Sequence, residues 1–217
     1  MYFKSRAEAG QRLAKGLQKY QKEPTAIVAL SDGAVVVGAQ IAAVLHCVIT
    51  MLLMEPIRLP GEPDPVAVIN QDGGFTYNNM YSTGQLEEFA AEYYHFIEQA
   101  KMEKLDEMHR LLGKGGLIRK DLLRGHNIIL VSDGLSSGFS LDAAADYLKP
   151  VKAKRLIVAT PFASVPAVDR MHILTDEIHC LSVIENALET NHYYTNNTLP
   201  SHETIVSTIK NIVDHWK

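Results

Sequence analysis

Short, uninterrupted apolar runs alternate with segments of helical periodicity along most of this chain. Runs such as 26–30 and 127–131 lack the polar alternation of a half-exposed strand, which predicts strands buried on both faces. Segments 6–20 and 35–45 place apolar residues at helical spacing. This alternation favours an α/β fold with a parallel-sheet core and helices on both faces. Further strands are predicted at 48–54, 156–159 and 178–183.

The middle of the chain interrupts this alternation. Several prolines and a glycine predict a loop over 56–65, and Asp72-Gly73-Gly74 predicts the turn of a hairpin over 69–77. Residues 85–112 carry a long apolar stripe and predict one continuous helix. The tetrad Gly113-Lys114-Gly115-Gly116 follows that helix, and no Ser or Thr follows its lysine, so it predicts a C-cap and a connector.

Composition excludes several classes of protein. The 217 residues, of which 47% are hydrophobic, are enough for one domain with a sizeable core. A net charge of −4 provides no basic surface for nucleic acid, and the 9 His and 2 Cys residues show no metal-ligand spacing. No apolar segment of a secretory signal follows the first residues, and the longest apolar stretch, 41–54, is too short to span a bilayer. We therefore expect a cytoplasmic protein without a membrane partner.

Segment 128–140 is the most informative part of the chain, because an apolar strand leads into an acid and then a turn rich in serine and glycine. The turn opens a predicted helix, whose first N–H groups have no intrahelical acceptor and whose dipole favours negative charge. Ser136, Ser137 and Ser140 add hydroxyl donors, and Gly138 lets an anion approach the backbone. These residues predict a phosphate-binding loop; the simpler alternative is that the serines only cap the helix.

This segment resembles the ribose-phosphate signature of type I phosphoribosyltransferases: four apolar residues, two acids, three variable residues, Thr or Ser, Gly, one variable residue, and Thr or Ser. Ser132 replaces the first acid, and Asp133 matches the second. The resemblance continues at 3–14, 26–38, 155–161 and Tyr193-Tyr194. It implies a type I phosphoribosyltransferase-like fold, with a single domain over 1–217 that has its core at about 1–180 and a small hood with a C-terminal helix at about 181–217.

The resemblance also implies a reaction and a site. Members of the family displace pyrophosphate from phosphoribosyl pyrophosphate with a nitrogen nucleophile, and Mg²⁺ neutralises the leaving group. Asp133 occupies the position of the family's catalytic acid, which contacts the ribose hydroxyls. Tyr193 and Tyr194 are candidates for base stacking, and the alternative is that they are core aromatics. The ribose 5-phosphate would be held by Ser132, Asp133, Gly134, Leu135, Ser136, Ser137, Gly138, Phe139 and Ser140.

The half of the site that would hold the diphosphate departs from the family pattern. Relatives have an arginine and two glycines where this chain has Ser31, Asp32, Gly33 and Ala34, and Glu55 stands where a Lys or Arg is expected. One unit-charge pair at about 6 Å is worth roughly 3 kcal/mol at an effective dielectric near 20, so each reversal opposes diphosphate binding. Mg²⁺ held by either acid would relieve this repulsion.

We therefore expect a protein that binds a small phosphate ligand containing ribose 5-phosphate, either phosphoribosyl pyrophosphate or a nucleotide. Phosphoribosyl transfer is expected to be weakened or lost. The first alternative is a non-catalytic, nucleotide-binding regulator. The sequence leaves open whether the protein forms a homo-oligomer.

A second alternative is an α/β-hydrolase-like esterase, because Gly134 to Gly138 also fits the Gly-x-Ser-x-Gly turn of those enzymes. Ser136 would be the nucleophile. No His-Gly-Gly oxyanion segment accompanies the turn, so this alternative is less favoured. Its partners would come from Asp169 or Asp176, followed by His179, His192 or His202.

Overall fold

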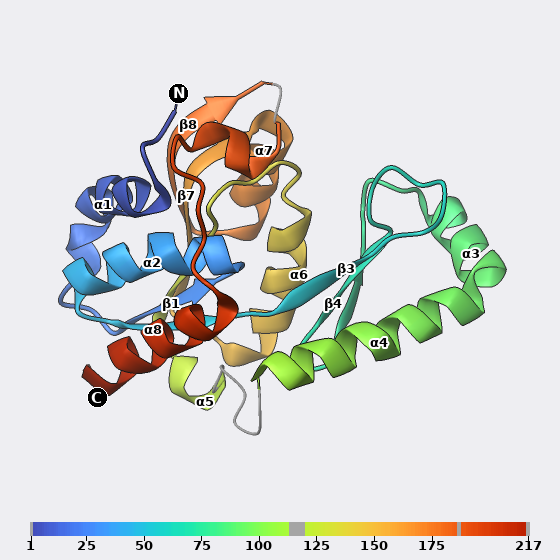
Figure 1. The fold of residues 1–217 in the computed structure, drawn as a ribbon, viewed down its shortest axis with the longest axis horizontal. Helices are drawn as coiled ribbons and strands as arrows, with labels where there is room; N and C mark the ends of the chain where they lie inside the picture. The colour runs from blue at the N-terminus through green and yellow to red at the C-terminus, as the bar shows by residue number, and fades with distance from the viewer. Residues whose placement is uncertain (1, 113–119, 186–187, 216–217) are drawn as a thin grey trace.

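The computed structural model describes residues 2–112, 120–185 and 188–215. Its core is a five-stranded sheet in the order β2-β1-β6-β7-β8, with every neighbouring pair parallel (Figure 1). All residues of β1 and β6 are buried, which explains their largely uninterrupted apolar sequences. The expected parallel sheet is confirmed. The strands are β1 (Thr25–Ala29), β2 (Val48–Met51), β6 (Asn127–Val131), β7 (Arg155–Ser164) and β8 (Glu177–Ile184).

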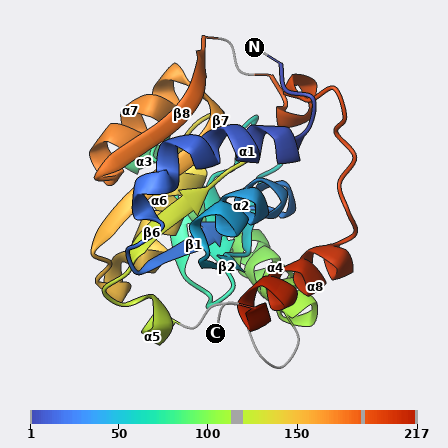
Figure 2. The same cartoon turned by 90° about the vertical axis from the view of Figure 1, so that its left-hand side faces the viewer.

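Helices cover both faces of this sheet (Figure 2). One face packs against α1 (Arg6–Leu17), α2 (Asp32–Leu45) and α8 (His202–His215). The other face packs against α5 (Lys120–Leu123), α6 (Phe139–Leu148) and α7 (Val165–Leu174). Successive β1 residues alternate between the two cores, so that Ile27 joins the first and Val28 the second. In the described part of the chain, short 3₁₀ turns lie at η1 (Gln18–Tyr20), η3 (Lys149–Val151) and η4 (Thr190–Tyr193).

After β2 the chain leaves the core sheet and forms an arm, residues 54–112. Its antiparallel sheet joins β3 (Met54–Ile57), β4 (Ala67–Asn70) and β5 (Phe75–Tyr77) in that order. The predicted hairpin is β4–β5, whereas the apolar run over 48–54 is divided between the two sheets and is not one strand. Pro56 was expected in a loop but lies in β3, an edge strand, where a residue without an N–H is tolerated.

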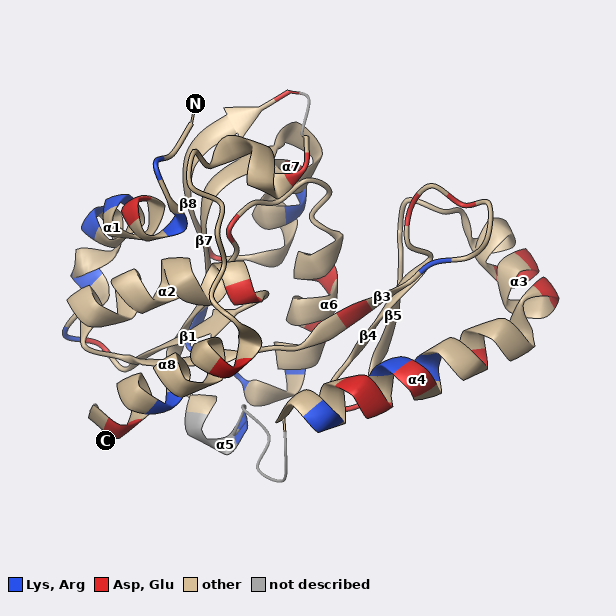
Figure 3. Cartoon of the chain, viewed as in Figure 1, with Lys and Arg blue, Asp and Glu red and all other residues tan. Residues whose placement is uncertain are grey.

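The helix predicted over 85–112 is two helices, α3 (Thr83–Glu92) and α4 (Tyr94–Leu112). The break falls at Tyr93, whose φ of −105° and ψ of 21° lie outside the helical region. Within the predicted stripe, Ile97 and Met108 are buried against the arm's sheet. Charged residues are distributed along both helices (Figure 3). The connector predicted at 113–116 lies outside the described residues.

Residues 181–217, the expected hood, contribute the end of β8, η4 and α8. Ile205 and Ile209 of α8 are buried in the core that α2 and β2 also line. Between η4 and α8, residues 194–201 form what we call the C-terminal strap. This strap is tied to the start of the chain, because the N–H groups of Thr195 and Asn196 donate to the carbonyls of Phe3 and Lys4, each at 2.9 Å.

Across the described ranges, each helix is either too short or too polar to serve as a membrane span.

Glu177, the first residue of β8, ties this edge strand to η1, the turn that follows α1. Lys19 Nζ lies 2.6 Å from Glu177 Oε1, and the Tyr20 hydroxyl donates to Glu177 Oε2 at 2.6 Å. Burial disfavours the charged carboxylate, but hydrogen bonds from Lys19, Tyr20 and His179 outweigh burial and lower the pKa of Glu177 to about 2. The ionised form of this carboxyl therefore stabilises the folded state.

We expect Glu177→Gln to destabilise the protein at neutral pH. Because the folded-state pKa lies below the ordinary value of 4.5, the carboxylate's contribution is complete above pH 4.5 and is lost as the pH falls through about 2. The difference in urea-unfolding free energy between wild type and variant should therefore shrink over that window. Glu88→Gln, on the exposed side of α3, is the control. A difference that stays constant from pH 6 to pH 2 would contradict this assignment.

Candidate functional site

The 132–140 loop begins where β6 ends and is pinned to β7. Leu135 N–H donates to the Phe162 carbonyl at 3.1 Å, and Ser164 N–H donates to the Leu135 carbonyl at 2.9 Å. Ser132 shapes the start of the loop, because its hydroxyl donates to the Gly134 carbonyl at 2.9 Å and accepts from the Gly134 N–H at 3.2 Å. An ionised acid at this position could accept but not donate, so Ser132 supports a turn that the family's usual acid could not hold in the same way.

Two glycines of this loop are required by close packing. A Cβ on Gly134 would lie 2.4 Å from Phe162 Cζ. Gly138 has a φ of +76°, and a Cβ there would lie 2.9 Å from Arg170 Cβ on α7. Gly138 is also the N-cap of α6, so its left-handed conformation turns the chain into that helix.

Three consecutive amides follow Leu135, at the exposed Ser136 and Ser137 and at the buried Gly138. Within the described residues, the N–H groups of Ser136, Ser137 and Gly138 have no hydrogen-bond acceptor. They precede the positive end of α6, an arrangement suited to an oxyanion. Ser136 and Ser137 are exposed, whereas Ser140 is half-buried in the first turn of α6.

A cavity of about 520 Å³, called the loop cavity here, lies beside these amides. Its volume is in the range of small-molecule sites. From the core it is lined by Ser136, Ser137, Phe139, Ser164, Pro166 and Glu185, and from the arm by Arg58, Asp64, Pro65, Asn78 and Met80.

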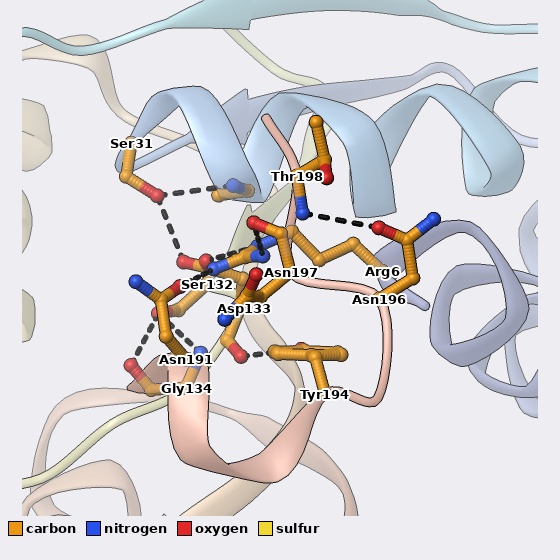
Figure 4. A network of polar contacts seen from close by, with 11 residues as sticks. Arg6, Ser31, Ser132, Asp133, Gly134, Asn191, Tyr194, Asn196, Asn197 and Thr198 are labelled. Atoms are coloured by element: carbon orange, nitrogen blue, oxygen red, sulfur yellow. Dashed lines mark hydrogen bonds and ion pairs between the residues drawn. The ribbon is translucent and has the colours of Figure 1, made fainter. Parts of the chain in front are cut away.

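Asp133 is held by groups from three other parts of the chain (Figure 4). Arg6 Nε donates to Asp133 Oδ2 at 2.7 Å, and the Ser31 hydroxyl donates to Oδ1 at 2.9 Å. The Tyr194 hydroxyl donates to the Asp133 carbonyl at 2.6 Å. Arg6 also donates to the Asn191 side chain at 2.7 Å, and its guanidinium lies 4.5 Å from the Tyr194 ring centroid. The exposed fractions of the Arg6 and Asp133 side chains are 4% and 12%, so this ion pair is buried.

Residues 31–34 are not a free loop, because α2 begins at Asp32. The Ser31 hydroxyl caps α2 by accepting from the Ala34 N–H at 3.0 Å. A Cβ on Gly33 would lie 2.0 Å from Asp133 Oδ2, so only glycine lets α2 approach Asp133 this closely. This segment therefore supports Asp133 directly.

The structure brings the two acids of the expected diphosphate position together. Asp32 and Glu55 line a second cavity of about 360 Å³, together with Asp133 and His202; we call it the acidic cavity. Each acid already has a partner, since His202 Nδ1 lies 3.0 Å from Asp32 Oδ1 and Lys104 Nζ lies 3.2 Å from Glu55 Oε2. The repulsion expected from the sequence is therefore partly compensated by Lys104 of α4, while Asp32 is engaged by His202 of α8.

A comparison with protein-family models shows which family this chain belongs to. The phosphoribosyl transferase domain matches residues 78–195, more than half of the chain. This chain belongs to the phosphoribosyl transferase family. The expected family is thereby confirmed.

Individual relatives agree with this assignment. Two curated proteins of Mycobacterium tuberculosis, MT0597 and Rv0571c, are named provisionally as phosphoribosyl transferases, and each is 24% identical over 207 residues. These alignments cover 94% of this chain but 46% of each relative, so the chain spans about half their length. TT1426 from Thermus thermophilus has the same fold, with a TM-score of 0.71 and 24% identity over 100% of this chain and 99% of that one.

Tyr193 and Tyr194 are core aromatics in this family member. Both are buried, and both pack with Phe3 and Phe162. Neither is among the residues that line the loop cavity or the acidic cavity. The role that the structure gives Tyr194 is to hold Asp133 through its hydroxyl.

The hydrolase alternative lacks its histidine. Within the described ranges, no hydrogen bond joins the Ser136 side chain to a histidine, and its carbonyl accepts from the Ser164 hydroxyl. The candidate histidines are engaged elsewhere: His179 with Glu177, His192 with Tyr2 and His202 with Asp32. This geometry does not support an activated serine.

Arg6 and Lys104 were missed as site residues, and His202 was considered only as a partner of Ser136, not of Asp32. Arg6 had a local signal, because it lies on the same helical stripe as the buried Leu13 and Leu17, where a lone charge needs a partner. Lys104 and His202 had none, since they meet acids 49 and 170 residues away along the chain.

We expect Gly138→Ala to destabilise the protein more than Gly125→Ala. Both glycines have positive φ, +76° and +74°, but a Cβ on Gly125 would meet no atom within 4 Å. Backbone strain should cost either variant about 1–3 kcal/mol, and crowding against Arg170 should add about 1–3 kcal/mol in Gly138→Ala. Urea unfolding measures both. Equal losses would show that α7 yields to the extra carbon at no cost.

We expect Arg6→Ala to cost about 3–5 kcal/mol of unfolding free energy, because it leaves the Asp133 carboxylate buried without its cation. Arg6→Ala with Asp133→Asn removes the charge as well, and should be less destabilised than Arg6→Ala alone. Chemical denaturation of the single and double variants tests the sign of this coupling. A double variant less stable than Arg6→Ala would contradict the ion-pair account.

Proposed function

We propose that this chain binds a ligand containing ribose 5-phosphate, with the 5′-phosphate at the amides of Ser136, Ser137 and Gly138. The single observation that carries the proposal is this row of unpartnered amides at the start of α6, beside the loop cavity. Membership of the phosphoribosyl transferase family supports the ribose phosphate as the ligand class.

Asp133 is proposed to accept hydrogen bonds from the ribose hydroxyls. A carboxylate offers about four acceptor positions, and Arg6 and Ser31 occupy one on each oxygen. Arg6 also supplies the positive charge that keeps the carboxylate from repelling the ligand's phosphate. The ribose would therefore meet a fixed, neutralised acceptor.

The described residues contain no preformed protein site for the Mg²⁺ that the family uses. No group of three or more His, Cys, Asp or Glu side chains there could hold a metal ion. The acids that share the acidic cavity are bound by Arg6, Lys104 and His202, which would have to be displaced first. These residues do not fit a metal held by the protein alone.

We propose that transfer from phosphoribosyl pyrophosphate is weakened, because a diphosphate near the acidic cavity would face the carboxylates of Asp32, Glu55 and Asp133, while the cations Arg6 and Lys104 are already engaged with two of them. A monophosphate avoids this cavity. The same observation favours the second candidate, a non-catalytic nucleotide-binding regulator. Release of pyrophosphate from phosphoribosyl pyrophosphate, measured with a panel of nitrogen bases, separates the two functions.

We expect Ser137→Asp to abolish ribose 5-phosphate binding without loss of stability. An acid at the start of α6 interacts favourably with the helix dipole, and its oxygen can replace the Ser137 hydroxyl as acceptor for the Phe139 N–H. The same charge repels a phosphate at the loop amides. Calorimetric titration with ribose 5-phosphate measures the affinity, and thermal unfolding checks the fold.

Ser207→Asp, at an exposed position of α8, is the matched control and should bind as wild type does. Wild-type affinity in Ser137→Asp would mean that the loop is not the phosphate site. Wild-type protein that binds neither ribose 5-phosphate nor a nucleoside monophosphate would refute the proposal as a whole.

A further inference from the structure

Arg58 faces the 132–140 loop from the arm. It follows β3 directly and lines the loop cavity with Ser136 and Ser137. Among the residues that line this cavity, Arg58 is the single Lys or Arg. Within the described residues it forms no ion pair, and its hydrogen bond to the Pro63 carbonyl is long, at 3.4 Å. Its guanidinium can therefore meet an anion at little cost in broken contacts.

The arm is docked on the helix that the loop opens, and this docking sets where Arg58 stands. Val68 of β4 packs against Phe139 and Ala143 of α6. Asn79 Nδ2 donates to Asp142 Oδ2 at 3.1 Å, and Arg170 of α7 pairs with the same carboxylate. One buried acid on α6 thus joins the arm to α7.

The arm side of the cavity is itself ordered by hydrogen bonds. Asn78 Nδ2 donates to the Pro65 carbonyl at 2.7 Å, and the Met80 N–H donates to Asn78 Oδ1 at 3.1 Å. Asn78, Pro65 and Met80 all line the loop cavity. The segment opposite the loop is therefore held in place, which limits the conformational entropy lost when Arg58 binds a ligand.

The charges around the loop cavity favour a single phosphate there. The loop offers amides and hydroxyls but no cation, and a phosphate monoester carries close to two negative charges at neutral pH. Arg58 supplies the positive charge, while Asp64 and Glu185 on the same cavity disfavour a second phosphate. We propose that Arg58 binds the ligand's phosphate across the cavity, so that the arm and the core together form a site for one phosphate monoester. This inference rests on the proposed function.

The test compares Arg58→Ala, Arg58→Lys and Arg110→Ala in titrations with ribose 5-phosphate and with inorganic phosphate. Arg110 is an exposed arginine of α4 on the same arm and serves as the matched control. We expect Arg58→Ala to weaken ribose 5-phosphate binding tenfold or more, about 1.4 kcal/mol. Arg58→Lys keeps the charge but loses the planar fork, so its affinity should fall in between. Arg110→Ala should bind as wild type does.

The outcomes separate this inference from the proposed function. Binding lost in Ser137→Asp but unchanged in Arg58→Ala overturns the role of Arg58 and leaves the loop as the phosphate site. No binding by wild type, or full binding by both variants, overturns the proposed function and the role of Arg58 with it. Because Arg58 is exposed, both of its variants should unfold at the wild-type temperature, and Arg58→Lys gives a folded comparison in any case.

Discussion

The buried ion pair between Arg6 and Asp133 holds the site together. Its two residues are 127 positions apart, and the groups that complete it come from the start of α2 and from the C-terminal part of the chain. A buried charge without a partner is strongly unfavourable, so the first helix, the loop after β6 and the segment around η4 must assemble together. The conformation of Asp133 thus depends on both ends of the described chain. The ribose recognition proposed for Asp133 depends on a carboxylate whose charge is already paired with Arg6 in the fold.

A second carboxylate, Asp142, plays a comparable part between the arm and the core. It is buried between Asn79 of the arm and Arg170 of α7. Val68 and Phe139 add an apolar contact beside it. Because α6 carries the available amides at its N-terminal end, the same helix positions the loop and the arm that faces it. The loop cavity therefore forms because α6 holds both the loop and the arm in place.

The acidic cavity shows why the net charge of a site cannot be judged from one local segment of the sequence. Asp32 and Glu55 suggest a region hostile to a diphosphate, and they do share one cavity. Lys104 and His202 reach them from distant helices; Lys104 reduces the net negative charge without being free for a ligand, and His202 occupies Asp32 through a hydrogen bond. Such pairs are partly desolvated, and the cost of separating them opposes any ligand that needs their charges. Selectivity among phosphate ligands would then come from which ion pairs a ligand disturbs.

The sequence by itself determined the α/β class, the buried strands of the core, the hairpin of the arm and the loop between β6 and α6, because each depends on local apolar periodicity and turn chemistry. It also suggested the family through the residues of that loop. The break at Tyr93 and the division of the 48–54 run could not be inferred, since an apolar stripe continues through both. The tertiary structure alone decided that Tyr193 and Tyr194 pack in the core, that Arg6 binds Asp133, and that Arg58 lines the same cavity as Ser136 and Ser137. Those contacts join residues far apart in the chain, and local sequence carries no information about which distant charge or ring will fill the space beside a given side chain.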